Sequence, residues 1–241
     1  MNTQKSWIYA EKQIGKDYNT PEEVESYDAR HGKFRDIERE NEAIVDVLKL
    51  SPGHTVIDFG TGTGAFALRA AKSCTRVHAI DISAEMLACA KRKAKQLGLD
   101  NIVFHHAGFL SYHHDAAPVD AVVTNTALHH LPDFWKALAL RRINTMMKTG
   151  GLFYLSDVVF SPRNTAAHIE QWIEKLGQIG GETLRKDAEA HIRDEFSTFD
   201  WILEGLLERS GFEILRKEIT GGVIGGYFCK KNADLHWDAE L

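Results

Sequence analysis

Hydrophobic and polar positions along the chain form a pattern that predicts strands and helices in alternation. Short apolar runs rich in β-branched residues predict buried strands, and apolar residues three or four positions apart predict helices. The strands are expected at 55–59, 75–82, 101–105, 119–124 and 152–155. Helices are expected between them, at 65–71, 83–97 and from 132 to the glycine pair at 150–151. This alternation predicts a parallel sheet with right-handed crossovers and helices on both faces.

The pattern changes toward both ends of the chain. Residues 1–34 are polar with scattered aromatic residues, and a helix is expected within 34–50. Near the other end, Thr198 is expected to cap a helix that ends at Gly211. The strands predicted next, at 212–215 and 223–228, are too close for a helical crossover, so we expect them to pair antiparallel.

The segment 157–197 contains no convincing strand. Its apolar positions Ile169, Trp172, Ile173 and Leu176 recur at helical spacing. Because this segment follows the fifth predicted strand, it begins at the sheet edge where ligands of such folds bind. We expect a helical cover that closes a ligand pocket together with the N-terminal helices; an insertion packed outside the sheet is the alternative.

Three glycines alternate with threonine between the first predicted strand and its helix, in Gly60-Thr61-Gly62-Thr63-Gly64. Such a turn presents backbone N–H groups to a ligand at a helix N-terminus. The spacing also fits the dinucleotide pattern, and Asp81 lies at the distance expected of a ribose-binding acid. However, Asp58 stands two positions before the first glycine, where a carboxylate would repel a pyrophosphate but suits a ligand with an ammonium group.

The run Asp58-x-Gly60-x-Gly62-x-Gly64 resembles motif I of the class I S-adenosylmethionine (SAM) methyltransferases. The resemblance covers roughly residues 40–160 and 196–231, and it implies a doubly wound α/β fold with a seven-stranded, mostly parallel sheet and an antiparallel C-terminal pair. It also implies that SAM is the cofactor, that Asp58 helps to hold its methionine moiety, and that Asp81 takes both ribose hydroxyls. The other implied cofactor contacts are Gly60, Thr61, Gly62, Gly64, Ile82, Met86, Gly108, Phe109, Asn125 and His130.

The chain departs from the family at Gly108. Many relatives have an acid near this position, and it receives the adenine amino group. Here a backbone carbonyl can replace the carboxylate, or Phe109 can stack on the adenine ring; a core position for Phe109 is the alternative.

The run Leu128-His129-His130-Leu131 is similar to one found in small-molecule methyltransferases, and the resemblance implies that Asn125 before it faces the methionyl part of SAM. An imidazole with a pKa near ~6.5 can take a proton from an acceptor hydroxyl or amine. We therefore predict that His129 and His130 are catalytic, the alternative being hydrogen bonds to loop backbone. The predicted substrate-binding residues are Tyr18, Tyr27, Asp157 and Trp172.

Composition narrows the function further. The net charge of −5 and the pI near 6.2 argue against a large nucleic-acid footprint. The chain has neither an apolar run of membrane-spanning length nor a signal-peptide core, and its three cysteines have neither disulfide nor zinc spacing. A reduced, cytoplasmic protein is expected.

The twelve histidines do not predict a metal site. The neighbours His105 and His106 point to opposite faces of a strand, so they cannot share one ion. The run His113-His114-Asp115 lies in a polar loop where a solvated role is expected.

We predict one domain over 1–241, with a helical cover (1–50), a nucleotide-binding core (51–156), a helical insertion (157–197), and a last helix with a strand pair (198–231). The predicted function is SAM-dependent methyl transfer to a small-molecule acceptor. Three alternatives stay open. An NAD(P)-dependent oxidoreductase predicts a further βαβ unit in place of the antiparallel pair. An RNA methyltransferase requires a basic patch, and the third alternative is a SAM-binding protein without turnover.

Overall fold

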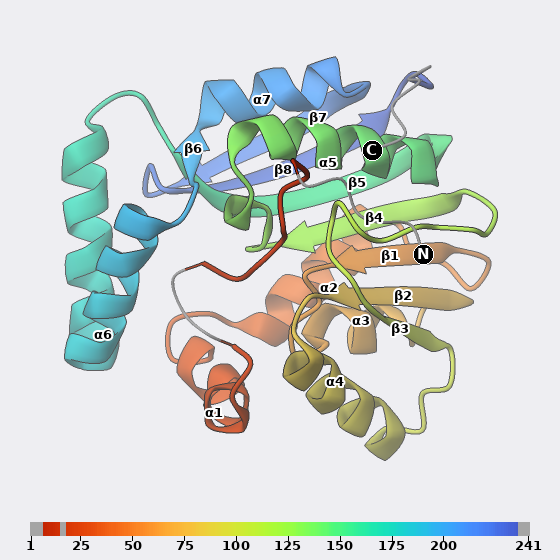
Figure 1. The fold of residues 1–241 in the computed structure, drawn as a ribbon, viewed down its shortest axis with the longest axis horizontal. Helices are drawn as coiled ribbons and strands as arrows, with labels where there is room; N and C mark the ends of the chain where they lie inside the picture. The colour runs from red at the N-terminus through yellow and green to blue at the C-terminus, as the bar shows by residue number, and fades with distance from the viewer. Residues whose placement is uncertain (1–6, 15–17, 236–241) are drawn as a thin grey trace.

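A twisted sheet runs through the centre of the computed structural model, which describes residues 7–14 and 18–235 (Figure 1). Its strand order is β3-β2-β1-β4-β5-β8-β7, with β1 to β5 parallel and β8 antiparallel to both neighbours. The short β6 pairs with the end of β5. The predicted doubly wound sheet and its antiparallel C-terminal pair are confirmed. The strands are β1 (Thr55–Phe59), β2 (Arg76–Asp81), β3 (Ile102–His106), β4 (Val119–Asn125), β5 (Met147–Phe160), β6 (Thr198–Phe199), β7 (Phe212–Thr220) and β8 (Ile224–Lys231).

Helices cover both faces of the sheet because neighbouring strand residues point to opposite sides. In β1, Ile57 packs into the core beneath α5 and α7, whereas Val56 packs against α2 and α3. This central strand is therefore apolar on both faces, as expected of a buried parallel sheet. The helices are α1 (Pro21–His31), α2 (Ile37–Val47), α3 (Ala65–Ala70), α4 (Ala84–Gln96), α5 (Asp133–Met146), α6 (Thr165–Asp194) and α7 (Asp200–Arg209), with a 3-10 turn η1 (Leu128–His130).

Two predicted helix boundaries are wrong. The helix that starts at Asp133 ends at Met146, and Gly150 and Gly151 lie inside β5. Gly151 belongs there because a Cβ would lie 3.1 Å from the carbonyl oxygen of Asp120 on the neighbouring strand. Thr198 does not cap the last helix, because its hydroxyl donates to Asp133 Oδ2 at 3.0 Å and the residue itself is part of β6.

The segments α1 and α6 lie beyond the carboxyl ends of the parallel strands (Figure 1). At Gly181 the backbone leaves the helical conformation (φ 69°, ψ −162°), and this break divides α6 into two arms. Leu176 in the first arm and Leu184 in the second are buried together, with Phe34 and Trp172 packed against them. The long insertion is thus a helical hairpin with a small core of its own.

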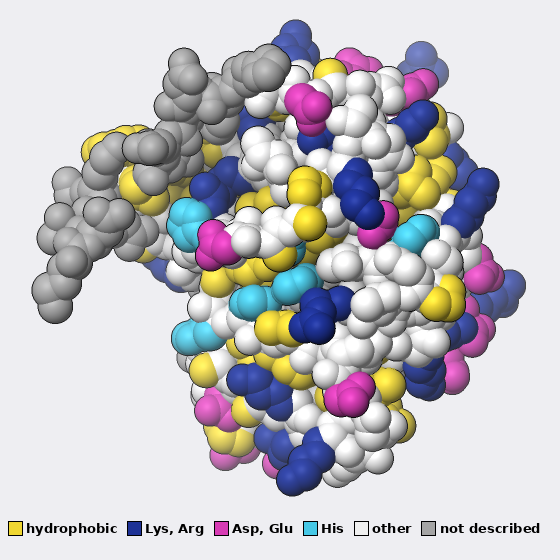
Figure 2. Space-filling model, turned by 90° about the vertical axis from the view of Figure 1, so that its right-hand side faces the viewer, with side chains coloured by type: hydrophobic (Ala, Val, Ile, Leu, Met, Phe, Trp, Pro, Cys, Tyr) yellow, Lys and Arg dark blue, Asp and Glu magenta, His cyan; other side chains and the backbone are white. Residues whose placement is uncertain are grey.

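The opposite edge of the sheet, at the amino ends of the parallel strands, has a mixed surface. Figure 2 shows Lys and Arg side chains interspersed with Asp and Glu on this face, and histidines gathered near its middle. No single-sign patch of the kind that binds nucleic acid is evident on this face. None of the helices that the structure describes has the length and apolar character needed to cross a membrane.

Candidate functional site

A cavity of about 90 Å³ lies at the carboxyl edge of the sheet, beside the point where strand order reverses between β1 and β4. Ligands of open α/β sheets bind at such a point. The loops after β1 to β4 and the N-terminal segment form its walls. Of the residues predicted to bind cofactor or substrate, those on the wall are Gly60, Gly62, Asp81, Ile82, Met86, Gly108, Phe109, His130, Tyr18 and Tyr27.

The glycine turn uses its glycines in two ways. Gly60 has φ 70°, and a Cβ on it would lie 2.3 Å from the Cβ of Ala127, so close packing against the loop after β4 excludes a side chain. Gly62 has φ 54°, but a Cβ there would meet no atom within 4 Å. Gly60 therefore serves the packing of the fold, whereas Gly62 leaves space open on the cavity side.

Asp81 is buried at the end of β2 and links the first two loops. Its Oδ2 accepts from the N–H of Gly62 and its Oδ1 from the N–H of Ser83, each at 2.8 Å. Burial raises the pKa of Asp81, and the two backbone donors oppose that shift. The carboxylate is thus oriented at the cavity wall with acceptor capacity to spare.

Asp58, Thr61, Gly64 and Asn125 are not among the residues that line the cavity. Asp58 is buried behind the turn, where its Oδ2 accepts from the hydroxyl of Thr61 at 2.6 Å. Burial raises the pKa of Asp58 to about 7. Near neutral pH this carboxyl is therefore poised between its two protonation states.

An acid from the N-terminal segment occupies the position beside Gly108. The Oε2 of Glu11 accepts from the backbone N–H of Ser111 at 3.0 Å and from its hydroxyl at 2.8 Å. A Cβ on Gly108 would lie 2.4 Å from the Oε1 of Glu11, so the glycine makes room for this carboxylate. Sequence reasoning missed Glu11; the absence of an acid near Gly108 was the only signal that pointed to it.

Phe109 serves both the core and the cavity wall. Its ring stacks on Phe59, with centroids 5.0 Å apart and an interplanar angle of 16°. Phe109 is buried in the cluster beneath α5, and it also lines the cavity. The two roles that the sequence left open are therefore compatible.

Tyr18 and Tyr27 form an aromatic pair on the cavity wall opposite the sheet. Their ring centroids are 5.5 Å apart in an edge-to-face arrangement, and both pack against Met86 of α4. The carbonyl oxygen of Tyr18 accepts from the hydroxyl of Ser83 at 2.8 Å. This bond fixes the N-terminal segment to the start of α4.

The two histidines after β4 have different environments. His129 is buried, with Nδ1 2.5 Å from Asp157 Oδ1 and Nε2 3.1 Å from Glu195 Oε2. Burial disfavours the imidazolium, but Asp157 and Glu195 outweigh it and raise the pKa of His129 to about 9. Both ring nitrogens of His129 thus face carboxylates, and the ring does not line the cavity.

His130 lies on the cavity wall. Its Nδ1 is buried without a hydrogen-bond partner in the described part of the chain. Burial, together with the neighbouring His129, lowers the pKa of His130 to about 3, so the ring is neutral near pH 7. Of the two histidines, His130 is thus the one that lines the cavity and has a ring nitrogen without a described partner.

The other predicted substrate-binding residues lie away from the cavity. Asp157, in the middle of β5, accepts from the backbone N–H of His129 at 3.0 Å in addition to its contact with the ring. Trp172 packs in the α6 hairpin, with its ring 5.9 Å from that of His191. Neither side chain lines the described cavity.

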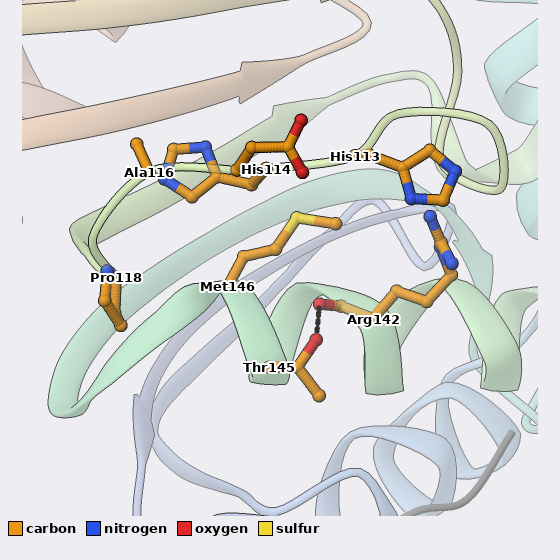
Figure 3. A pocket seen from close by; sticks show the side chains of 8 residues that line it. His113, His114, Ala116, Pro118, Arg142, Thr145 and Met146 are labelled. Atoms are coloured by element: carbon orange, nitrogen blue, oxygen red, sulfur yellow. Dashed lines mark hydrogen bonds between the residues drawn. The ribbon is translucent and has the colours of Figure 1, made fainter. Parts of the chain in front are cut away.

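A second cavity, of about 210 Å³, lies at the amino edge between the loop before β4 and the end of α5. Figure 3 shows His113 beside Arg142 at one side and Met146 in the middle. His113 is exposed, as predicted, but His114 is partly buried and its Nδ1 lies 3.0 Å from the hydroxyl of Tyr112. This cavity is at the sheet edge opposite the glycine turn, so it is no part of the site described above.

Comparison with known proteins identifies the family to which the chain belongs. A family model described as a methyltransferase domain matches residues 50–211. The chain is 27% identical over 195 residues to an uncharacterized methyltransferase of Anoxybacillus flavithermus, covering 79% of this chain and 86% of that protein.

Two solved structures have a similar fold. A SAM-dependent methyltransferase from Clostridium acetobutylicum aligns with a TM-score of 0.66 and 14% identity, over 88% of this chain and 98% of that one. Magnesium protoporphyrin IX methyltransferase from Synechocystis, solved with bound S-adenosylhomocysteine, aligns with a TM-score of 0.58 and 18% identity, over 81% and 83%. The antiparallel β7–β8 pair argues against the oxidoreductase alternative. The chain belongs to the methyltransferase-domain family, and its cofactor is SAM.

Proposed function

We propose that this methyltransferase transfers the SAM methyl group to a small-molecule acceptor that enters between His130 and the Tyr18–Tyr27 pair. The observation that carries the proposal is the cavity itself. Its walls include the glycine turn and Asp81, the Tyr18–Tyr27 pair and the neutral imidazole of His130. A concave pocket with a few polar groups suits a small molecule better than a polymer.

The proposed cofactor contacts follow from two acids on the cavity wall and one behind it. Asp81 takes the ribose hydroxyls, and Glu11 receives the adenine amino group beside Gly108. Asp58 is buried behind the glycine turn, and we propose that it meets the methionine ammonium group when the cavity opens. Each carboxylate is an acceptor matched to a donor on the ligand, and hydrogen bonds to charged groups are the stronger kind. Phe59 and Phe109 supply an apolar wall next to the Glu11 carboxylate.

The cavity must open for the cofactor to enter. Its volume of about 90 Å³ is well below the ~300–1,000 Å³ of typical small-molecule sites. The side-chain bonds that hold the N-terminal segment over it include those of Glu11 to Ser111 and of Ser83 to the carbonyl oxygen of Tyr18. We infer that this segment moves outward when SAM binds and then closes on the acceptor.

His130 is the proposed proton acceptor because, of the two histidines, it is the one that lines the cavity and is neutral near pH 7; its pKa of about 3 makes it a weak base. His129 instead positions the turn, since its ring is already held between Asp157 and Glu195. Methyl transfer itself needs the acceptor atom in line with the sulfonium, so most of the rate comes from positioning. Removing a proton from the acceptor adds typically ~10²–10⁴-fold.

The test measures binding and turnover separately. Calorimetry should show micromolar binding of SAM and S-adenosylhomocysteine and no binding of NADH. A screen of small molecules and, in parallel, of RNA would identify the methyl acceptor. With that acceptor, His130→Ala should lower methyl transfer ~10²-fold or more while cofactor affinity stays near normal. Should RNA be the only methylated substrate, the small-molecule proposal is wrong. If His129→Ala and His130→Ala both turn over normally, the histidine pair is structural.

A further inference from the structure

A cluster of metal-binding side chains borders the cavity. One potential ligand atom each from His129, His130 and Glu195 lies within 4.8 Å of the other two. The two histidines come from η1, directly after β4, and Glu195 follows the end of α6. Segments far apart in the sequence thus bring two imidazoles and a carboxylate together next to the cavity.

Neighbouring side chains orient two members of the cluster, His129 and Glu195. Asp157 holds Nδ1 of His129, which turns Nε2 toward Glu195. His191 places Nδ1 2.5 Å from Glu195 Oε2, and its own Nε2 lies 2.8 Å from the hydroxyl of Ser197. In metal sites, a ligand histidine typically contacts a carboxylate through its other ring nitrogen, and a ligand carboxylate contacts a further polar group; these outer contacts fix the ligands in place.

One atom of this set has no partner although it is buried: Nδ1 of His130 has none among the described residues. Glu195 Oε2, in contrast, already contacts His129 Nε2 at 3.1 Å and His191 Nδ1 at 2.5 Å, so two imidazoles share one carboxylate oxygen. Buried polar atoms in native proteins are nearly always paired, so an unpaired nitrogen in this cluster calls for an explanation. A bound cation would supply its partner.

The backbone holds the two segments in this arrangement. The N–H of Phe196 donates to the carbonyl oxygen of His129 at 2.9 Å. The buried ammonium of Lys136 donates to the carbonyl oxygen of Phe196 and, at 2.7 Å, to Asp133. The position of Glu195 beside His129 therefore does not depend on their side-chain contact alone.

We propose that His129, His130 and Glu195 bind a divalent transition-metal ion such as Zn²⁺ or Fe²⁺, with its open coordination position toward the cavity. Two histidines and one carboxylate are a recurring ligand set for these ions, and a site with three protein ligands leaves room for a further one. Ligand atoms around tetrahedral zinc lie about 3.4 Å apart, given bonds of about 2.0–2.1 Å, so small side-chain rotations would close this set on an ion.

The ion would define the class of acceptor, and this step rests on the proposed function. An acceptor hydroxyl or enol oxygen in the open position would lose its proton to water more readily beside the positive charge. The oxygen lone pair then bonds to the methyl carbon while the carbon–sulfur bond of SAM breaks, and its electron pair stays on the sulfur of S-adenosylhomocysteine. With the ion bound, His130 serves as a ligand and takes no proton.

The test titrates chelator-treated protein with Zn²⁺ by calorimetry, and with Co²⁺ by visible absorption. We expect one tight site in the wild type. His130→Ala and Glu195→Gln should weaken it a hundredfold or more, and His113→Ala, at the exposed amino edge, should leave it unchanged. The Co²⁺ bands should indicate nitrogen and oxygen ligands without thiolate, because the three cysteines are buried elsewhere.

His130→Ala removes an unpaired buried nitrogen and no described hydrogen bond, so we expect it to fold, which circular dichroism would verify. If wild type and His130→Ala bind Zn²⁺ equally, the cluster is only an ion-pair contact between η1 and α6, and the proposal is overturned. Titration of the same samples with S-adenosylhomocysteine keeps the two proposals apart. Cofactor binding without Zn²⁺ binding overturns the ion site, whereas Zn²⁺ binding without cofactor binding overturns the proposed function.

Discussion

Replacing Glu11 by alanine should weaken cofactor binding through the adenine ring alone. The carboxylate of Glu11 lies against Gly108 and is oriented by two hydrogen bonds from Ser111. If it receives the adenine amino group, the variant loses a charge-assisted hydrogen bond. Such a bond contributes about 1.5–3 kcal/mol. The expected loss of affinity for S-adenosylhomocysteine is therefore roughly tenfold to a hundredfold.

A second effect of the substitution must be separated from the first. Glu11→Ala also removes the bonds between the N-terminal segment and Ser111, which could loosen the segment over the cavity. Ser111→Ala is the control, because it removes the hydroxyl's bonds to Glu11 and to the N–H of Gly108 and leaves both the carboxylate and the backbone N–H of residue 111 in place. Ser111 has no proposed contact with the cofactor, so this control should cost less affinity than Glu11→Ala.

The assay pairs protein and ligand changes in a thermodynamic cycle. Calorimetry compares S-adenosylhomocysteine with the analogue whose adenine is replaced by hypoxanthine, which lacks the amino group. In the wild type, loss of the amino group should cost the same tenfold to hundredfold, and in Glu11→Ala it should cost almost nothing. An equal penalty in both proteins would refute the contact between Glu11 and the adenine ring.

Three further predictions concern the rest of the site. Burial raises the pKa of Asp58 to about 7, and the ligand's ammonium group favours the ionised carboxylate. Calorimetric affinity for S-adenosylhomocysteine should therefore fall by up to about tenfold per pH unit below pH 7 and stay level above it. Asp58→Asn should flatten this pH profile. Both glycines have positive φ, so alanine is strained at either position; Gly60→Ala adds a collision with Ala127 and should lower the melting temperature more, whereas Gly62→Ala should cost more in cofactor affinity, and the reverse order would contradict the two roles. Hydrogen exchange with S-adenosylhomocysteine should show added protection in 10–34 and 157–197 as well as in the glycine turn, and a response limited to the turn would mean that these segments do not form a lid.

The sheet and the glycine turn could be predicted because their causes are local. Val56 and Ile57 face opposite sides of a buried strand, so both must be apolar, and the sequence shows this directly. Asp58 and Asp81 are at or next to strand ends, where the chain must turn toward the ligand edge. The error at Gly150 has the opposite cause. A glycine pair after a helical pattern predicts a helix end, but this pair lies inside β5, where the carbonyl oxygens of Lys148 and Asp120 leave no room for a side chain at Gly151.

The remaining features of the site depend on contacts between distant segments. Glu11 and Ser111 are 100 positions apart, and His129 and Asp157 are 28 apart. No spacing rule connects such pairs, because their distance is set by how the chain packs over the sheet edge. Asp157 shows the consequence: it was assigned to the substrate from its place after a predicted strand, but β5 continues to Phe160 and the carboxylate holds His129 instead.

Part of the site is set by neighbouring strands and part by segments that cover the cavity. The glycine turn and Asp81 are fixed by adjacent strands, and this part of the chain lies within the region that the family model matches. Glu11 and Tyr18 lie outside that region, whereas Glu195, which follows the α6 hairpin, lies inside it. Members of one family can therefore share the glycine turn and Asp81 while they differ in the N-terminal cover. We expect acceptor specificity to depend on the stretch around Tyr18 and Tyr27, and exchanging this stretch between relatives, with Glu11 kept in place, should change the acceptor while SAM binding is retained.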